Sequence, residues 1–214
     1  MNPFFYCFLI LTGWPVFYLI FRTKVIYETP RRKKRYFTSN TIVISNHTSI
    51  FDYVALMMVI VPRFPYTLGA EILYEKNFLF TFLLNCLGVI RVDRVTHETK
   101  ALAKAIRLLR KGKLIYMFPE GRIPLSEEHG RLLPFNAGFA YMAIKTGAEI
   151  VPVFTDGNLF TLKRNNIIVG DKVNIKDLCR ENLSLHENAE IITDFFHGRI
   201  EELGKELERR KQKA

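Results

Sequence analysis

The chain has 214 residues, and 31 lysines and arginines against 21 acidic residues give it a formal net charge of +10. This length suits one domain with a substantial core, and three widely separated cysteines exclude a disulfide framework and zinc-like spacing, so we expect a reducing compartment and no metal. The positive charge fits nucleic acid, an anionic membrane surface or an anionic substrate.

The first predicted element is apolar, because no charged residue occurs from Pro3 to Phe21. Its length is near the minimum for crossing a bilayer. Gly13-Trp14-Pro15 interrupts it, and a proline removes a helical hydrogen bond, so two half-helices in one leaflet are an alternative to a single span. A buried core helix is a third reading. We expect residues 1–23 to form a membrane-associated helical segment.

A short strand is predicted at Val25-Ile26-Tyr27, and the basic run Arg31 to Arg35 follows it. Basic residues beside a lipid-seeking segment are typical of the cytoplasmic face, because anionic lipid attracts them. A nucleic-acid arm is the alternative, but the position between an apolar segment and a strand favours lipid. We therefore expect a protein of the cell membrane, with its active domain on the cytoplasmic side and no nucleic-acid partner.

The next predicted strand, Thr41 to Ile44, leads through a polar turn into a helix from Tyr53 to Val61. The turn contains His47 and Asp52. A carboxylate in the first helical turn can hold one nitrogen of a histidine ring protonated, which leaves the other nitrogen free to take a proton from a hydroxyl. The alternative is a helix capping box with Ser49 as N-cap, in which His47 is an ordinary turn residue.

Strands and helices alternate along the rest of the chain, which predicts an α/β fold: a single domain over residues 24–214 with a mostly central β-sheet flanked by helices. The helix expected at Glu71–Leu87 is apolar all round, which suits a core face or contact with lipid or an acyl chain. The other expected elements are strands near Tyr66–Leu68, at Val89–Val92, Leu114–Phe118 and Glu149–Phe154, helices at Glu98–Lys111 and Asn136–Thr146, a hairpin about Gly170-Asp171, and a charged helix over about 187–214.

Polar residues follow three of the predicted strands: His47 with Asp52, then Asp93-Arg94, then Glu120-Gly121-Arg122. If these strands are neighbours, a base and its orienting carboxylate meet two guanidinium groups at one sheet edge. The planar fork of arginine suits phosphate, although a surface ion pair is the alternative for each arginine. The chain has no GxSxG elbow and no Walker A motif, so the base is expected to act on a hydroxyl of the substrate.

Four ordered blocks resemble those of the glycerophospholipid acyltransferases, most nearly the 1-acylglycerol-3-phosphate (lysophosphatidate) acyltransferase branch. The resemblance covers roughly residues 4 to 155. The blocks are Asn46-His47 with Asp52, Gly88 to Arg94, Phe118-Pro119-Glu120-Gly121-Arg122, and Ile150-Val151-Pro152-Val153.

The resemblance implies catalytic roles for His47 and Asp52, and a substrate phosphate site at Arg94, Glu120, Gly121 and Arg122. It places Val151 and Pro152 near the acyl or donor site. The implied co-substrate is a fatty acyl thioester of coenzyme A or of acyl carrier protein, with no further cofactor, and the implied partner is membrane lipid.

The chain departs from the family pattern in its third block, where Glu120-Gly121-Arg122-Ile123-Pro124 stands in place of the commoner Glu-Gly-Thr-Arg-Ser. The reaction type is thus better defined than the acceptor. We expect acyl transfer to the free hydroxyl of a lysophospholipid, with 1-acylglycerol-3-phosphate giving phosphatidic acid. The alternatives are another glycerophosphate or lysolipid acceptor, a lipid hydrolase, and a membrane-anchored protein that binds anionic ligands without turnover.

Overall fold

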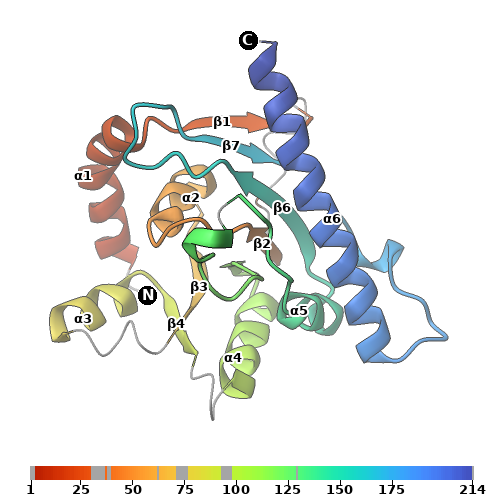
Figure 1. Cartoon of the computed structure of the whole chain (residues 1–214). Coiled ribbons are helices and arrows are strands. Elements are labelled where there is room, and N and C mark those ends of the chain that lie inside the picture. Colours follow the sequence, from red (N-terminus) through yellow and green to blue (C-terminus); the bar gives the residue numbers. More distant parts are fainter. Residues whose placement is uncertain are drawn as a thin grey trace.

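The computed structural model describes residues 3–29, 37, 40–61, 63–70, 77–92, 98–128 and 130–213 (Figure 1). Its helices are α1 (Pro3–Phe21), α2 (Asp52–Ile60), α3 (Phe78–Cys86), α4 (Glu98–Arg110), α5 (Gly138–Thr146) and α6 (Leu185–Gln212), with short 3-10 helices at Ser126–Glu128 and Ile175–Asp177. Its strands are β1 (Lys24–Tyr27), β2 (Thr41–Ser45), β3 (Pro65–Ala70), β4 (Val89–Val92), β5 (Leu114–Met117), β6 (Glu149–Thr155) and β7 (Asn166–Val169).

The described strands form one sheet in the order β1-β7-β6-β2-β5-β3-β4. All neighbouring pairs are parallel except β6 and β7, which are antiparallel. Strand β2 lies between β6 and β5, and all of its residues are buried. A parallel strand covered on both faces reads as a continuous apolar run, which is why Thr41 to Ile44 was recognisable in the sequence.

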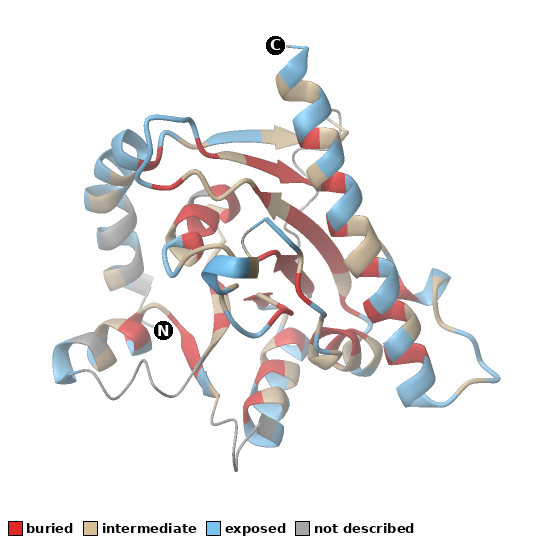
Figure 2. Cartoon of the chain, viewed as in Figure 1, coloured by how far each residue is buried: buried red, intermediate tan, exposed pale blue. Residues whose placement is uncertain are grey.

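Helices cover both faces of this sheet, because successive side chains of a strand point to opposite sides. On one face, Ile42 and Ile44 of β2 belong to a core cluster with residues of α4, α5 and α6. On the other face, Val43 belongs to a second cluster with α2 and with Phe21, the last residue of α1. Figure 2 shows the buried residues along the central strands and on the inner sides of the helices. The predicted α/β class with a central sheet is confirmed.

Helix α1 runs without a break through Pro15, so the alternative of two half-helices is wrong. Most of its large apolar side chains outside the buried Phe21 are exposed, among them Phe4, Leu11 and Leu19. Within the described ranges, no helix has the length and apolar character needed to cross a bilayer. The basic run Arg31 to Arg35 lies outside the described residues.

Two predicted elements differ from the structure. The helix expected over Glu71–Leu87 is described only as Phe78–Cys86, since residues 71–76 lie outside the described ranges. The hairpin about Gly170-Asp171 is wrong: Val173 bridges to Ile150 of β6 instead of pairing with β7. Strand β7 already has β1 and β6 as its two neighbours, so no edge remains for a hairpin partner.

Candidate active site

The carboxyl ends of β2 and β6 are joined by the side chain of Asn46. Its amide Nδ2 donates to the carbonyl of Thr155 at 2.9 Å, and its Oδ1 accepts from the backbone N–H of Thr155 at 2.9 Å. Both residues are buried. Because this reciprocal pair fixes the last residues of two central strands, the loop that follows β2 begins from a defined position. Asn46 belongs to the first motif, but no sequence pattern indicates this role.

His47 and Asp52 meet in that loop, as their spacing around a turn predicts. Asp52 is the first residue of α2 and is 1% exposed. Its Oδ2 lies 3.0 Å from His47 Nδ1 and accepts the backbone N–H groups of Thr48 at 2.5 Å and Ser49 at 2.8 Å. Its Oδ1 accepts from the Thr48 hydroxyl at 2.9 Å. Four donor groups therefore fix the carboxylate, which in turn fixes the ring.

The capping-box alternative is wrong, because the N-cap of α2 is Phe51 and no side chain caps it. The Ser49 hydroxyl accepts only a long contact from the Phe51 N–H at 3.3 Å. Asp52 turns away from the helix end and toward the loop that carries His47. The first residue of the helix therefore holds both the histidine ring and the backbone of the loop before it.

The His47 ring lies flat against Phe118, with ring centroids 3.9 Å apart and an interplanar angle of 10°. Its side chain is 16% exposed. Nδ1 is bound to Asp52, and Nε2 has no hydrogen-bond partner in the part of the chain that the structure describes. A ring held in this way can accept a proton at Nε2 from a hydroxyl that reaches it. The sequence marked Phe118 as part of a motif, without indicating this stacking.

Glu120, which follows β5, lies beneath the loop of His47. Its side chain is buried, with Oε1 accepting from the His47 backbone N–H at 2.7 Å and Oε2 from the Leu133 N–H at 3.0 Å. Burial raises the pKa of this carboxyl, and the two backbone donors oppose that shift. Both oxygens therefore bind backbone N–H groups. The contact with His47 joins residues 73 positions apart in the chain.

Gly121 occupies a position that excludes any side chain. Its φ is +71°, and an added Cβ would come within 2.8 Å of Asn136 Nδ2. Asn136 is fixed there, because its backbone N–H and its side chain both donate to the carbonyl of Pro119. The left-handed turn carries the chain from the buried Glu120 to the exposed Arg122.

Arg122 is paired with Glu128 across its own loop. The guanidinium makes two hydrogen bonds to the carboxylate, Nη1 to Oε2 at 2.6 Å and Nη2 to Oε1 at 2.7 Å. The Arg122 side chain is 45% exposed. Its hydrogen bonds lower the pKa of Glu128 to about 2, with a further contribution from the Leu125 N–H. A fork-to-fork pair of this kind has the geometry in which arginine also binds phosphate.

The strands that lead to the two expected phosphate ligands, Arg122 and Arg94, lie at different distances from β2 in the sheet. Strand β5, which leads to Glu120 and Arg122, is a direct neighbour of β2. Strand β4, which leads toward Arg94, is at the edge of the sheet, with β3 and β5 between it and β2. Asp93 and Arg94 themselves lie outside the described residues.

Val151 and Pro152 lie in β6, opposite Val43 and Ile44 of β2. Both are buried, and Val151 is part of the core cluster on the α2 side of the sheet. The structure therefore places them in the interior beneath the site, and their assignment to the acyl or donor site stays a prediction. Within the described ranges, no group of three or more His, Cys, Asp and Glu side chains is arranged to hold a metal ion.

Relatives of this chain are known from sequence. The profile of the family described as Acyltransferase matches residues 24–156. A 1-acyl-sn-glycerol-3-phosphate acyltransferase of Cocos nucifera is 31% identical over 142 residues, which cover 61% of this chain and 42% of the relative. A protein of the same name from Borreliella burgdorferi is 32% identical over 126 residues, covering 57% and 48%. The chain spans about half the length of these curated relatives.

The fold also has a counterpart among solved structures. The crystal structure of the 1-acyl-sn-glycerophosphate acyltransferase of Thermotoga maritima matches with a TM-score of 0.62 at 22% identity, covering 88% of this chain and 76% of that chain. At this identity the likeness supports the fold. The profile match spans more than half of the chain and contains His47, Asp52 and the loop of Arg122. The expected resemblance is confirmed, and the chain belongs to the Acyltransferase family.

Proposed function

We propose that the chain is an enzyme that transfers a fatty acyl group from an acyl thioester to the free hydroxyl of a lysophospholipid. The proposed acceptor is 1-acylglycerol-3-phosphate, which gives phosphatidic acid. Family membership and the names of the relatives support this choice. The observation that carries it is the His47 ring, bound through Nδ1 to the buried Asp52 while Nε2 remains available to a substrate.

In the proposed reaction, His47 Nε2 takes the proton of the acceptor hydroxyl as its oxygen attacks the thioester carbonyl. A new C–O ester bond forms, the C–S bond breaks, and the departing thiolate takes the proton back from the imidazolium. Asp52 holds the ring in the required tautomer and stabilises its charged form. Because the substrate supplies the nucleophile, no acyl-enzyme is required.

Arg122 is the proposed ligand of the acceptor phosphate, together with Arg94. In the structure its guanidinium is bound by Glu128, so a phosphate must replace that carboxylate. The exchange is feasible because the pair is half-exposed, and solvent-exposed ion pairs contribute little to stability. Glu120 is proposed as a positioning residue and not as a direct phosphate ligand, because it binds the backbone of His47.

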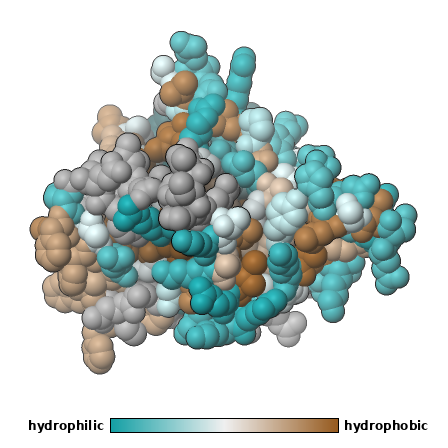
Figure 3. Space-filling view, turned by 90° about the horizontal axis from the view of Figure 1, so that it is seen from below, coloured by the Kyte–Doolittle hydropathy of each residue, from teal (hydrophilic) through white to brown (hydrophobic). Residues whose placement is uncertain are grey.

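Membrane lipid is the proposed partner, and the cytoplasmic face of the cell membrane the proposed location. Figure 3 shows hydrophobic side chains gathered on the side of the molecule where α1 and α3 lie. Near the His47 loop, the exposed rings of Phe51 and Phe160 pack together with centroids 4.7 Å apart, and Phe160 also packs on Phe21. This apolar surface beside the candidate base suits an enzyme whose acceptor and product are lipids.

The test is transfer of a labelled acyl group from acyl-coenzyme A and from acyl carrier protein to a panel of lysolipids. His47→Ala should lower kcat by about 10²-fold or more, since it removes the proton acceptor. The control is His186→Ala, which changes an exposed histidine that contacts Tyr141 and Glu190. Near-normal turnover by a folded His47→Ala protein would contradict the assignment. Release of free fatty acid without an acceptor would indicate a hydrolase, and binding without turnover an anchored binding protein.

A further inference from the structure

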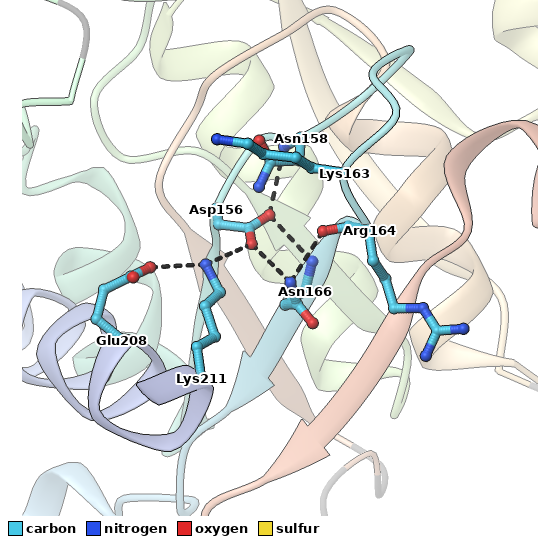
Figure 4. Close-up of a pocket in the computed structure, with 7 residues that line it drawn as sticks. All are labelled: Asp156, Asn158, Lys163, Arg164, Asn166, Glu208 and Lys211. Carbon is cyan, nitrogen blue, oxygen red and sulfur yellow. Dashed lines mark hydrogen bonds and ion pairs between the residues drawn. The ribbon is translucent and has the colours of Figure 1, made fainter. Parts of the chain in front are cut away.

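A polar cleft of about 530 Å³ lies between the loop that connects β6 to β7 and the last turns of α6 (Figure 4). Asp156 and Asn166 line its floor, and Glu208 and Lys211 of α6 form one side. This cleft is not used by the proposed reaction at His47. Its volume is within the range of about 300–1,000 Å³ that is usual for small-molecule sites.

The two acidic side chains of the cleft share one lysine as their ion-pair partner. Lys211 Nζ lies 2.7 Å from Asp156 Oδ2 and 2.6 Å from Glu208 Oε1. Asp156 also accepts from the backbone N–H of Asn166 at 3.0 Å and from its side-chain amide at 2.8 Å. These contacts occupy the Asp156 carboxylate, and Lys163 and Arg164 bring the charged side chains that line the cleft to three basic and two acidic.

Lys163 and Arg164 are the two basic side chains of the cleft that have no anionic partner among the described residues. Both are exposed, and in the described part of the chain neither side chain makes a hydrogen bond or an ion pair. In Figure 4 the guanidinium of Arg164 extends away from Asp156. Two neighbouring cations without anionic partners, on a cleft whose charged lining is net positive, favour an anionic ligand that carries more than one charge.

The cleft is joined to the loop of His47 by direct contact. Gly157, next to Asp156, has a φ of +68°, and an added Cβ would come within 2.6 Å of Thr48 Oγ1. The same Thr48 hydroxyl donates to Asp52. The backbone of Gly157 therefore packs directly against Thr48, so the cleft lies next to the loop of His47.

We propose that this cleft binds the nucleotide phosphates of an acyl-coenzyme A donor through Lys163 and Arg164. The inference rests on the proposed acyl transfer. It selects the coenzyme A thioester rather than an acyl carrier protein, because a nucleotide brings several phosphates into a concave site of this volume. The extended pantetheine arm between the phosphates and the thioester suits a donor held at the cleft and reacting at His47.

The test compares two donors that differ only in the nucleotide: acyl-coenzyme A and the corresponding acyl-pantetheine. In the double variant Lys163→Gln/Arg164→Gln, the KM for acyl-coenzyme A should rise about tenfold, because charge-assisted contacts to phosphate are lost. The KM for acyl-pantetheine and the KM for the lysolipid should stay the same. Adenosine 3′,5′-bisphosphate should inhibit the wild type competitively against acyl-coenzyme A, and should inhibit the variant less.

The matched control is Lys176→Gln/Arg180→Gln, which removes two exposed charges beside Val173, where the chain pairs with the amino end of β6. Equal losses with both donors, or no loss with either, would overturn the proposal. A loss confined to acyl carrier protein would overturn it in favour of a protein donor. If the wild type transfers from no donor, the proposed function fails; calorimetric binding of adenosine 3′,5′-bisphosphate to wild type and variant then still decides whether the cleft binds nucleotide phosphate.

Discussion

The loop after β2 and the loop after β5 carry the two halves of the candidate site, and they are held in different ways. The first is fixed by buried hydrogen bonds: Asn46 and Asp52 each make two or more that position its backbone or the His47 ring, and Glu120 accepts from the His47 N–H. The second ends in an exposed ion pair between Arg122 and Glu128. Buried hydrogen bonds are costly to break, whereas a half-exposed ion pair can exchange partners.

This difference matches two different roles, proton transfer and phosphate binding. The group that moves protons must be within about 3 Å of its target, and a misplacement of 1 Å can cost about 10²-fold in rate. The group that grips a phosphate must instead bind and release it in every cycle. Changes to the groups that hold His47, including Glu120 at the start of the second loop, should therefore lower kcat, and changes to the Arg122–Glu128 pair should alter KM.

The largest effect is expected from Asp52→Asn. An amide cannot accept from all four donor groups that surround this carboxylate, and it favours the wrong tautomer of His47. We expect kcat to fall by about 10²- to 10⁴-fold with a similar KM for the acceptor. Steady-state kinetics measure it, with Asp177→Asn, an exposed aspartate in a 3-10 turn, as control. A kcat within threefold of wild type would remove Asp52 from the mechanism.

A smaller loss is expected from Glu120→Gln. The amide can accept from only one of the two backbone N–H groups, so either His47 or Leu133 loses its partner. We expect kcat to fall about tenfold, while the KM for a phosphate-bearing acceptor changes less than twofold. A rise in KM with unchanged kcat would instead support direct contact between Glu120 and the acceptor. Glu181→Gln, an exposed change, controls for the substitution itself.

The same variant gives a pH test. Burial raises the pKa of Glu120 in the folded state, so the folded protein binds this proton more tightly than the unfolded chain does. Its contribution to stability therefore falls as the pH rises from the usual carboxyl pKa through the raised folded value. Glu120→Gln should remove this component from the pH dependence of the unfolding free energy, measured by denaturant titration. Identical pH slopes for wild type and variant would contradict the shift.

The smallest effect is expected from Glu128→Gln, which weakens the ion pair that Arg122 must break to bind a phosphate. We expect the KM for a phosphate-bearing lysolipid to fall about threefold without a change in kcat, as befits an exposed ion pair. Glu127→Gln is the neighbouring control, since Glu127 is exposed and makes no ion pair within the described residues. An increase in KM would show that Glu128 supports phosphate binding instead of competing with it.

The parts of the site that depend on local sequence were predictable. Thr41 to Ile44 is recognisable because a strand buried on both faces is continuously apolar, and His47 reaches Asp52 because a turn separates them. The contacts of Glu120 with His47 and Leu133 join distant segments, and no local pattern encodes them. The order of the strands is equally non-local: the sequence left open which strands are neighbours, and β4 lies at the sheet edge, separated from β2 by two strands.

The central claim is that His47 takes the acceptor proton in a preformed loop while Arg122 exchanges Glu128 for the acceptor phosphate. The most direct measurement is a crystal structure with lysophosphatidate and a non-transferable acyl-thioether analogue. We expect the acceptor hydroxyl within about 3 Å of His47 Nε2, the His47–Asp52 contact unchanged, and phosphate on Arg122 in place of Glu128. A hydroxyl far from His47, or a phosphate bound elsewhere with the Arg122–Glu128 pair intact, would contradict the account.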